Sequence, residues 1–191
     1  MKKVLAITIV LLGLFSCKIT KHNKGVFYDQ TVDPVDTISV TEMRDTTTEN
    51  LIQTGLFRLE RISNSFHFSK EFKKDFSHAI LVTTISDFRI YSYEVRKPTT
   101  DKEVLGWAGR RPFSENEFLV AFEELFKMQS RGRPVFLSNR KPNIFHVQTA
   151  DKRLVAVDIW YQSGEWCFHS RPLNSSWVSG GRMFLRRRFD R

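Results

Sequence analysis

The sequence predicts an α+β fold: one domain in which a mostly antiparallel sheet carries one principal helix, at about residues 114–130. Three observations lead to this prediction. One long segment has the apolar spacing of an amphipathic helix, and strand-like segments separated by turn-like residues follow it. The 191 residues include 17 Phe, enough apolar material for one core. The low counts of Gly, Pro and Cys exclude collagen-like and disulfide-rich classes.

The N-terminus has the pattern of a secretory signal, which we place at residues 1–16. Two lysines precede a run of mostly apolar residues, shorter than the ~20 residues that a membrane-spanning helix needs. The segment ends in Leu14-Phe15-Ser16-Cys17, which resembles the lipobox of bacterial lipoproteins. The resemblance implies a diacylglycerol on the Cys17 sulfur, cleavage before Cys17 and acylation of its amine. The alternative is a soluble secreted protein in which Cys17 has no such role.

Lipidation at Cys17 would make the membrane a partner and place the protein in the cell envelope. Residues 18–24 are basic, which favours contact with anionic lipid head groups. Some surface-exposed lipoproteins of Bacteroidetes-type bacteria carry an acidic signal just after the lipidated Cys, and this sequence lacks one. We therefore expect the protein to face the periplasm rather than the cell exterior.

Residues 17–54 are predicted to form a lipidated, Thr-rich, flexible tether, because they are poor in Leu and Phe and show no helical apolar stripe. Two triplets in this segment, Asp36-Thr37-Ile38 and Asp45-Thr46-Thr47, resemble the O-glycosylation site of Bacteroidetes. The resemblance implies Thr37 and Thr46 as acceptors. The alternative is a plain Thr-rich linker.

The folded domain is placed at residues 55–191, and its first half combines a short helix with two strands. Ser69 can cap a helix with three phenylalanines at four-residue spacing, Phe68, Phe72 and Phe76. Residues 79–85 and 88–95 are strand-like, and the short turn between them predicts a hairpin.

The principal helix has the clearest local signals in the sequence. Ser114 and Glu117 form a capping box, which satisfies two free amides at a helix start. Apolar residues then lie on one face, and Gly132 and Pro134 end the helix. Later strands are expected at residues 135–137, 144–149, 154–161, 165–170 and 183–188.

Cys167 and His169 are candidate catalytic residues, because a thiolate beside an imidazole can act as a nucleophile. They alternate along one predicted strand and point to the same side, but such neighbours lie ~7 Å apart, too far for direct proton transfer unless the strand bends. The alternative is a small buried Cys among aromatic residues. No metal-ligand spacing and no phosphate-binding Gly motif occurs, so neither a metal nor a cofactor is expected.

The net charge of +9 suggests an anionic partner. Arg182, Arg186, Arg187 and Arg188 are candidate anion-binding residues, because guanidinium groups bind phosphate and carboxylate with paired hydrogen bonds. In an envelope the available anions are lipid phosphates, acidic glycans and acidic protein surfaces, and we do not expect nucleic acid. The alternative is a solvated basic face, in which Arg186, Arg187 and Arg188 protect an exposed strand edge from pairing.

Together with the lipobox, these features predict a non-catalytic interaction or assembly module of the envelope, which binds an envelope protein or an anionic glycan or lipid. One alternative is a hydrolase of envelope glycan or peptide that uses Cys167 and His169. Another is a small-ligand carrier with a Trp-rich cavity between sheet and helix.

Overall fold

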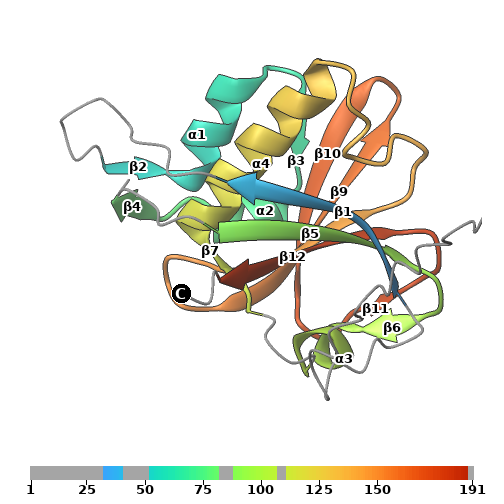
Figure 1. The fold of residues 1–191 in the computed structure, drawn as a ribbon. Coiled ribbons are helices and arrows are strands. Elements are labelled where there is room, and N and C mark those ends of the chain that lie inside the picture. Colours follow the sequence, from blue (N-terminus) through green and yellow to red (C-terminus); the bar gives the residue numbers. More distant parts are fainter. Residues whose placement is uncertain (1–31, 41–51, 82–87, 107–110, 189–191) are drawn as a thin grey trace, which may run out of the picture.

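The computed structural model describes residues 32–40, 52–81, 88–106 and 111–188, which form a central sheet with helices on both faces (Figure 1). Helices α1, α2 and α4 cover one face, and α3 lies with a short β ribbon on the other. In chain order the elements are β1 (Val32–Val40), β2 (Ile52–Thr54), α1 (Gly55–Ile62), β3 (Phe66–Phe68), α2 (Lys70–Asp75), β4 (Ala79–Leu81), β5 (Phe88–Val95), β6 (Thr99–Thr100), α3 (Asp101–Gly106), β7 (Phe113–Ser114), α4 (Glu115–Ser130), β8 (Asn143–Gln148), β9 (Leu154–Gln162), β10 (Glu165–Pro172), β11 (Ser176–Trp177) and β12 (Arg182–Arg188).

The central sheet is mixed. Its strand order is β1-β5-β12-β8-β9-β10-β3, with β7 paired to β8 off this path. The β12–β8, β10–β3 and β7–β8 pairs are parallel, whereas the other neighbours are antiparallel. The predicted α+β class is confirmed, but a mostly antiparallel sheet with one principal helix is wrong. Side-chain alternation predicts that a segment is a strand but not which strand it pairs with, and here β12 inserts between β5 and β8.

Helix α1 packs beside α4, so the principal helix has a neighbour on the same face of the sheet (Figure 1). The Thr54 hydroxyl caps α1 by accepting from the Phe57 amide at 3.1 Å. Leu59 is fully buried, and Arg58 pairs with Glu123 of α4 at 3.4 Å. This helix has only eight residues, and only two of them are buried, so its local sequence signal is short.

Helix α4 forms where it was predicted, with both hydrogen bonds of the capping box. The Glu117 amide donates to Ser114 Oγ at 3.3 Å, and the Ser114 amide donates to Glu117 Oε2 at 2.8 Å. Ser69 caps α2 in the predicted way, accepting from the Phe72 amide at 3.1 Å. Among the described residues, no helix has the length and apolar character needed to cross a membrane.

Strands β8, β9, β10 and β12 confirm four of the predicted strands. Residues 135–137 are not a strand, because side chains take the amides that a ladder would use: Phe136 donates to Gln129 Oε1 and Leu137 to Asn143 Oδ1. The expected hairpin of residues 79–95 is also wrong. β4 pairs with β2 in a separate two-stranded sheet, β5 lies between β1 and β12, and the expected turn is outside the described residues.

Part of the segment assigned to the tether belongs to the fold. Val32–Val40 forms edge strand β1, antiparallel to β5, and Ile52–Thr54 forms β2. The segment is rich in Thr and Val, and β-branched residues suit a strand as well as a linker. Pro34 lies at the register shift in β1, which suits a residue without an amide proton. Cys17 and Thr46 lie outside the described residues, and Thr37 is on β1.

Each face of the sheet has its own core. The larger core fills the space between the sheet and α1, α2 and α4, and Phe rings dominate it: Phe72, Phe76, Phe118, Phe122, Phe145, Phe168 and Phe184 are at most 1% exposed. The smaller core lies beneath α3, β6 and β11 and contains Tyr93, Val104, Ile144, Trp177 and Met183. Side chains of β9 therefore alternate between the two faces.

Candidate functional site

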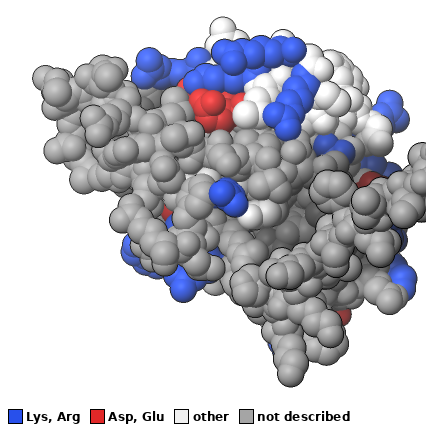
Figure 2. Space-filling model, viewed as in Figure 1, with Lys and Arg blue, Asp and Glu red and all other residues white. Residues whose placement is uncertain are grey.

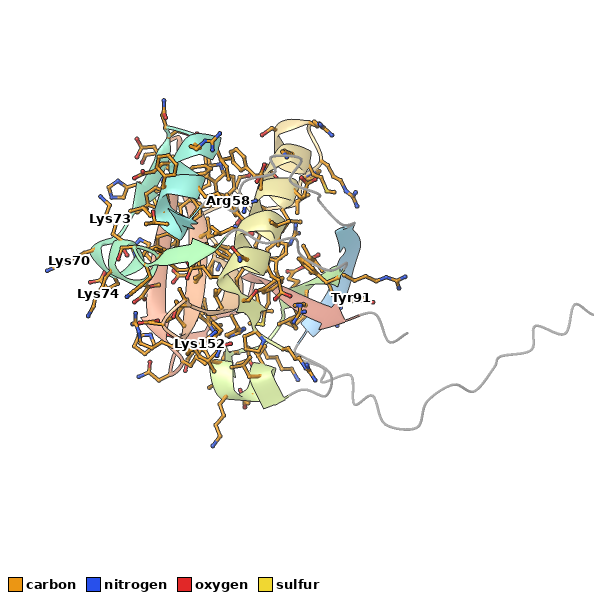
Figure 3. The ribbon with its side chains drawn as sticks, turned by 90° about the vertical axis from the view of Figure 1, so that its left-hand side faces the viewer. Arg58, Lys70, Lys73, Lys74, Tyr91 and Lys152 are labelled. Atoms are coloured by element: carbon orange, nitrogen blue, oxygen red, sulfur yellow. The ribbon has the colours of Figure 1, made fainter. Side chains whose placement is uncertain are left out.

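Basic side chains of the described residues are divided between several surfaces. In Figure 2 they gather over the helical layer, along the upper edge of the view. Figure 3 shows Lys70, Lys73 and Lys74 projecting from α2 at another edge, whereas Arg58 turns toward α4. Basic residues that spread in this way have the character of a solvated surface more than of one anion site.

β12 pairs with β5 along Arg182–Arg188 and with β8 along Arg182–Phe184, so Arg182 does not lie at a free edge. Beyond Phe184, Arg186 forms an isolated bridge with Arg111. The interpretation that Arg186, Arg187 and Arg188 protect a strand edge stays a prediction. Arg182 Nη1 donates to the backbone carbonyls of Pro134 and Val135, at 3.2 and 2.5 Å. For Arg187 and Arg188 the structure describes the backbone of β12 and not the side chains.

Arg186 joins the sheet to the start of α4. Its Nη2 lies 2.6 Å from Glu117 Oε1, and its guanidinium is 5.8 Å from the ring centroid of Phe88. The same Glu117 carboxylate completes the capping box of α4. Because the Arg186 side chain is only 13% exposed, its charge acts within the molecule more than toward an anionic ligand.

A second arginine, Arg171 on β10, is held in a fixed orientation and stays open to solvent. Its Nε and Nη2 donate to the two carboxylate oxygens of Asp158 on β9, at 2.9 and 3.2 Å. The guanidinium carbon lies 5.7 Å from the Trp160 ring centroid and 6.0 Å from that of Trp177, within cation–π range. Asp158 is fully buried, whereas the Arg171 side chain is 42% exposed.

Trp160, His169 and Arg171 together form what we call the β9–β10 ledge. All three are half-buried and lie on the face of the sheet opposite α4, beside the part that α3 and β11 cover. The rings of Trp160 and His169 meet edge-to-face, with centroids 5.4 Å apart. Burial raises the pKa of Asp158, against the attraction of Arg171. The ledge therefore presents one aromatic surface and a set of oriented N–H donors.

The predicted catalytic pair lies on the same face. Cys167 is half-buried, opposite Trp160 on β9 and beside His67 on β3. Burial and the Glu165 carboxylate raise the pKa of the Cys167 thiol. A nucleophilic cysteine needs the opposite shift, because the thiolate is the reactive form. His169, which would have to be the base, contacts the Trp160 ring.

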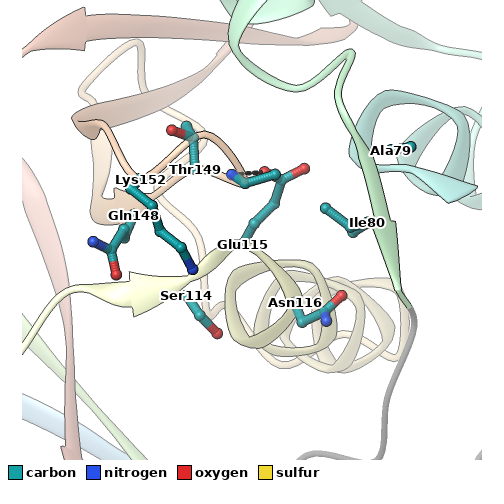
Figure 4. A pocket seen from close by; sticks show the side chains of 9 residues that line it. Ala79, Ile80, Ser114, Glu115, Asn116, Gln148, Thr149 and Lys152 are labelled. Carbon is teal, nitrogen blue, oxygen red and sulfur yellow. Dashed lines mark hydrogen bonds between the residues drawn. The ribbon is translucent and has the colours of Figure 1, made fainter. Parts of the chain in front are cut away.

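A polar pocket of about 280 Å³ lies at the start of α4, on the other face of the sheet (Figure 4). Its lining comes from β4, the start of α4 and the β8–β9 turn: Ala79, Ile80, Ser114, Glu115, Asn116, Gln148, Thr149, Ala150 and Lys152. Glu115 is 3% exposed; its Oε2 accepts from the Ala150 amide at 2.7 Å, and its Oε1 has no hydrogen-bond partner. No tryptophan lines this pocket, unlike the cavity expected for a carrier.

Burial raises the pKa of Glu115 to about 7, against the Ala150 amide and His78, which lower it; Asp151 and Asp75 add to the rise. A carboxyl group with a near-neutral pKa in a pocket is a feature of acid–base sites. However, Oε1 is shielded from solvent and faces Gly55, where an added Cβ would approach it to 2.5 Å. This group is therefore better placed to bind a proton than to contact a substrate.

Ion pairs and hydrogen bonds surround this pocket. Arg153 bridges Asp75 and Asp151, at 2.7 and 2.6 Å, and Asp75 also accepts from the Ser170 hydroxyl. Hydrogen bonds from Thr149 and Arg153 lower the pKa of Asp151 to about 2. The network joins α2, β10 and the β8–β9 turn, so it fixes the one wall of the pocket that this turn provides.

A buried polar network holds α3 and β11 against the sheet next to the ledge. Asp101 is fully buried and accepts from Trp177 Nε1 at 2.6 Å and from the Ser175 amide at 2.8 Å. Its Oδ1 lies 2.7 Å from His146 Nε2 on β8. These bonds fix the Trp177 ring, which in turn lies beside Arg171.

We compared the chain with protein families, curated proteins and solved structures. No protein-family model matches the chain, and neither the curated proteins nor the solved structures give a significant match.

Sequence reasoning placed Cys167 and His169 on one strand but missed the neighbours that define their surroundings. Asp158 and Trp160 lie two residues apart in the predicted strand 154–161, and Arg171 directly follows the predicted strand 165–170. What was missing was the antiparallel register of β9 and β10, which brings the three together. Glu115 gave no signal, because a Glu in the first turn of a helix is common.

Proposed function

We propose that this protein is a lipid-anchored, non-catalytic binding module of the bacterial cell envelope. Cys17 would carry the lipid, the protein would face the periplasm, and the folded domain would bind another envelope component. The observation that supports the binding role is the environment of Arg171. The buried Asp158 carboxylate orients its guanidinium beside Trp160 and Trp177, and 42% of the Arg171 side chain stays exposed. A preorganised donor next to an aromatic ring is a common device for recognition.

The chemistry of the same face favours binding over hydrolysis. The raised pKa of Cys167 lowers the thiolate fraction at neutral pH, because burial and the Glu165 carboxylate both disfavour the charged thiolate. A hydrolase that uses Cys167 and His169 therefore has less support than a binding surface built around them.

The β9–β10 ledge also replaces the C-terminal arginines as the proposed contact surface. Arg182 donates to the carbonyls of Pro134 and Val135, and Arg186 forms an ion pair with Glu117, so both guanidinium groups make contacts within the molecule. Arg171 is held at one edge of its guanidinium and has N–H groups left for a partner. The proposed partner remains an envelope protein, glycan or lipid.

The anchor and the binding role are tested separately. For the anchor, the full chain is expressed in a bacterial host with radiolabelled palmitate; we expect label in the wild type and none in Cys17→Ser. Failure of the wild type to incorporate palmitate, with unchanged detergent fractionation of Cys17→Ser, would refute the anchor.

For the binding role, the Cys17→Ser chain, which cannot carry the proposed lipid, is sedimented with isolated cell envelopes, and the substitutions below are made in this background. We expect Trp160→Ala to reduce the sedimented fraction at least fivefold and Phe57→Ala to leave it unchanged. Phe57 is a matched control, because it is an aromatic residue, it is 50% exposed, and it lies on α1, on the opposite side of the sheet from the ledge. A Cys17→Ser chain that stays in the supernatant would contradict the proposed binding role.

A further inference from the structure

The β9–β10 ledge has little net charge, although an arginine is its most exposed part. Arg171 and Asp158 form a bidentate pair, so their charges cancel at close range. A polyanion binds where several cations are in excess, as on a basic stripe. Among the described residues the ledge has no such excess of cations, so we expect its partner to carry few charges.

The ledge is nevertheless rich in hydrogen-bond donors. A guanidinium has five N–H groups, and Asp158 accepts from two of them, so three remain. Their directions are fixed, because the Asp158 carboxylate holds the plane of the group and Trp160 and Trp177 flank it. Donors that are already oriented bind a ligand with little loss of side-chain entropy.

The third property of the ledge is an aromatic ring beside these donors. Trp160 is half-buried, the Arg171 guanidinium carbon lies over its ring 5.7 Å from the centroid, and His169 meets the ring edge-to-face, so a ligand would contact the part of the ring that these two side chains leave exposed. A pyranose ring matches both properties, because one of its faces carries mainly C–H bonds while its rim carries hydroxyl oxygens.

We propose that the β9–β10 ledge binds an uncharged sugar unit of an envelope glycan, with the pyranose ring against Trp160 and its hydroxyl oxygens accepting from Arg171. This proposal rests on the proposed binding function and narrows it to one class of partner. His169, in edge contact with Trp160, borders the same sugar position and supplies a ring nitrogen that can donate or accept.

The test uses the full chain in detergent and three soluble probes: chitotetraose and cellotetraose, which are neutral, and heparin, which is a polyanion. Calorimetry and tryptophan fluorescence follow binding. We expect at least one neutral tetrasaccharide to bind and heparin to bind no better at low salt. Trp160→Leu keeps apolar volume but loses the ring and should weaken binding tenfold or more, whereas Trp160→Phe should retain most of it. Phe57→Ala should bind as the wild type does.

The opposing results separate this inference from the broader function. Sedimentation with envelopes together with no binding of either neutral sugar would overturn the glycan proposal and leave the binding function standing. Binding of heparin alone would overturn it in favour of an anionic partner. Equal sugar binding by the wild type and Trp160→Leu would remove the ledge as the site. Circular dichroism of each variant establishes that it is folded.

Discussion

Glu115 makes the stability of this domain depend on pH in a way that one substitution can isolate. The change is Glu115→Gln, which keeps the shape of the side chain and removes its titration. In the folded protein burial raises the pKa of this carboxyl from 4.5 to about 7. The folded state therefore binds the proton more tightly than the unfolded state, which is the reverse of an ordinary salt-bridged carboxylate.

The sign and size of the effect follow from this difference. The contribution of Glu115 is fully present below pH 4.5 and is lost as the pH rises through the folded pKa near 7. At 1.36 kcal/mol per pH unit, the loss is about 3 kcal/mol in total. Asp75, Asp151 and His78 also surround this carboxyl, and they remain unchanged in the variant, so the difference between the two proteins reports Glu115.

The assay is urea unfolding of the full chain and of Glu115→Gln at pH 4.5, 6 and 8. The glutamine amide finds no hydrogen-bond partner beside Gly55 at any pH, which gives a constant offset and no slope. The wild type should lose about 3 kcal/mol relative to the variant from pH 4.5 to 8. Glu103→Gln is the control. Hydrogen bonds from Thr100 lower the pKa of Glu103, so the stability that Glu103 contributes is present above pH 4.5 and is lost only at lower pH. The difference between the wild type and Glu103→Gln should therefore stay nearly constant from pH 4.5 to 8. A difference between wild type and Glu115→Gln that stays constant over this range would refute the reasoning.

Three further substitutions test the packing around the sheet. Arg186→Ala should lower the free energy of unfolding by about 3 kcal/mol, because it leaves the mostly buried Glu117 carboxylate without its cation. Urea unfolding measures this, with an alanine substitution of an exposed lysine on α2 as the control. Equal stability of the two variants would contradict the prediction. Arg171→Ala should cost about 2 kcal/mol, and adding Asp158→Asn should restore part of it; a double-mutant cycle with no coupling energy would argue against the pair. Gly55→Ala should cost about 1–3 kcal/mol, because its Cβ would meet Glu115 Oε1 at 2.5 Å, and the cost should shrink in a Glu115→Ala background.

Elements with strong local signals were predictable, and pairings between distant segments were not. The capping box at Ser114 and the apolar face of α4 are local, and so is the alternation in β9. The place of β12 between β5 and β8 depends on contacts with residues about 40 and 90 positions away, which no local pattern encodes. The same holds for the candidate site. Cys167 and His169 were found on one strand, whereas the cross-strand pairing of Asp158 with Arg171 needed the register.

The place of β1 in the sheet sets a limit on where the domain can work. If the lipid is on Cys17, the chain between the anchor and Val32 spans at most about 50 Å when fully stretched, whereas a start of the fold at residue 55 would allow about 130 Å. β1 is at one end of the strand order and β9 is four strands away, which adds about 20 Å across the sheet. If the proposed anchor and the proposed ledge both hold, the anchored end and the binding surface lie toward opposite sides of the sheet, and only polymer within about 70 Å of the bilayer would be in range.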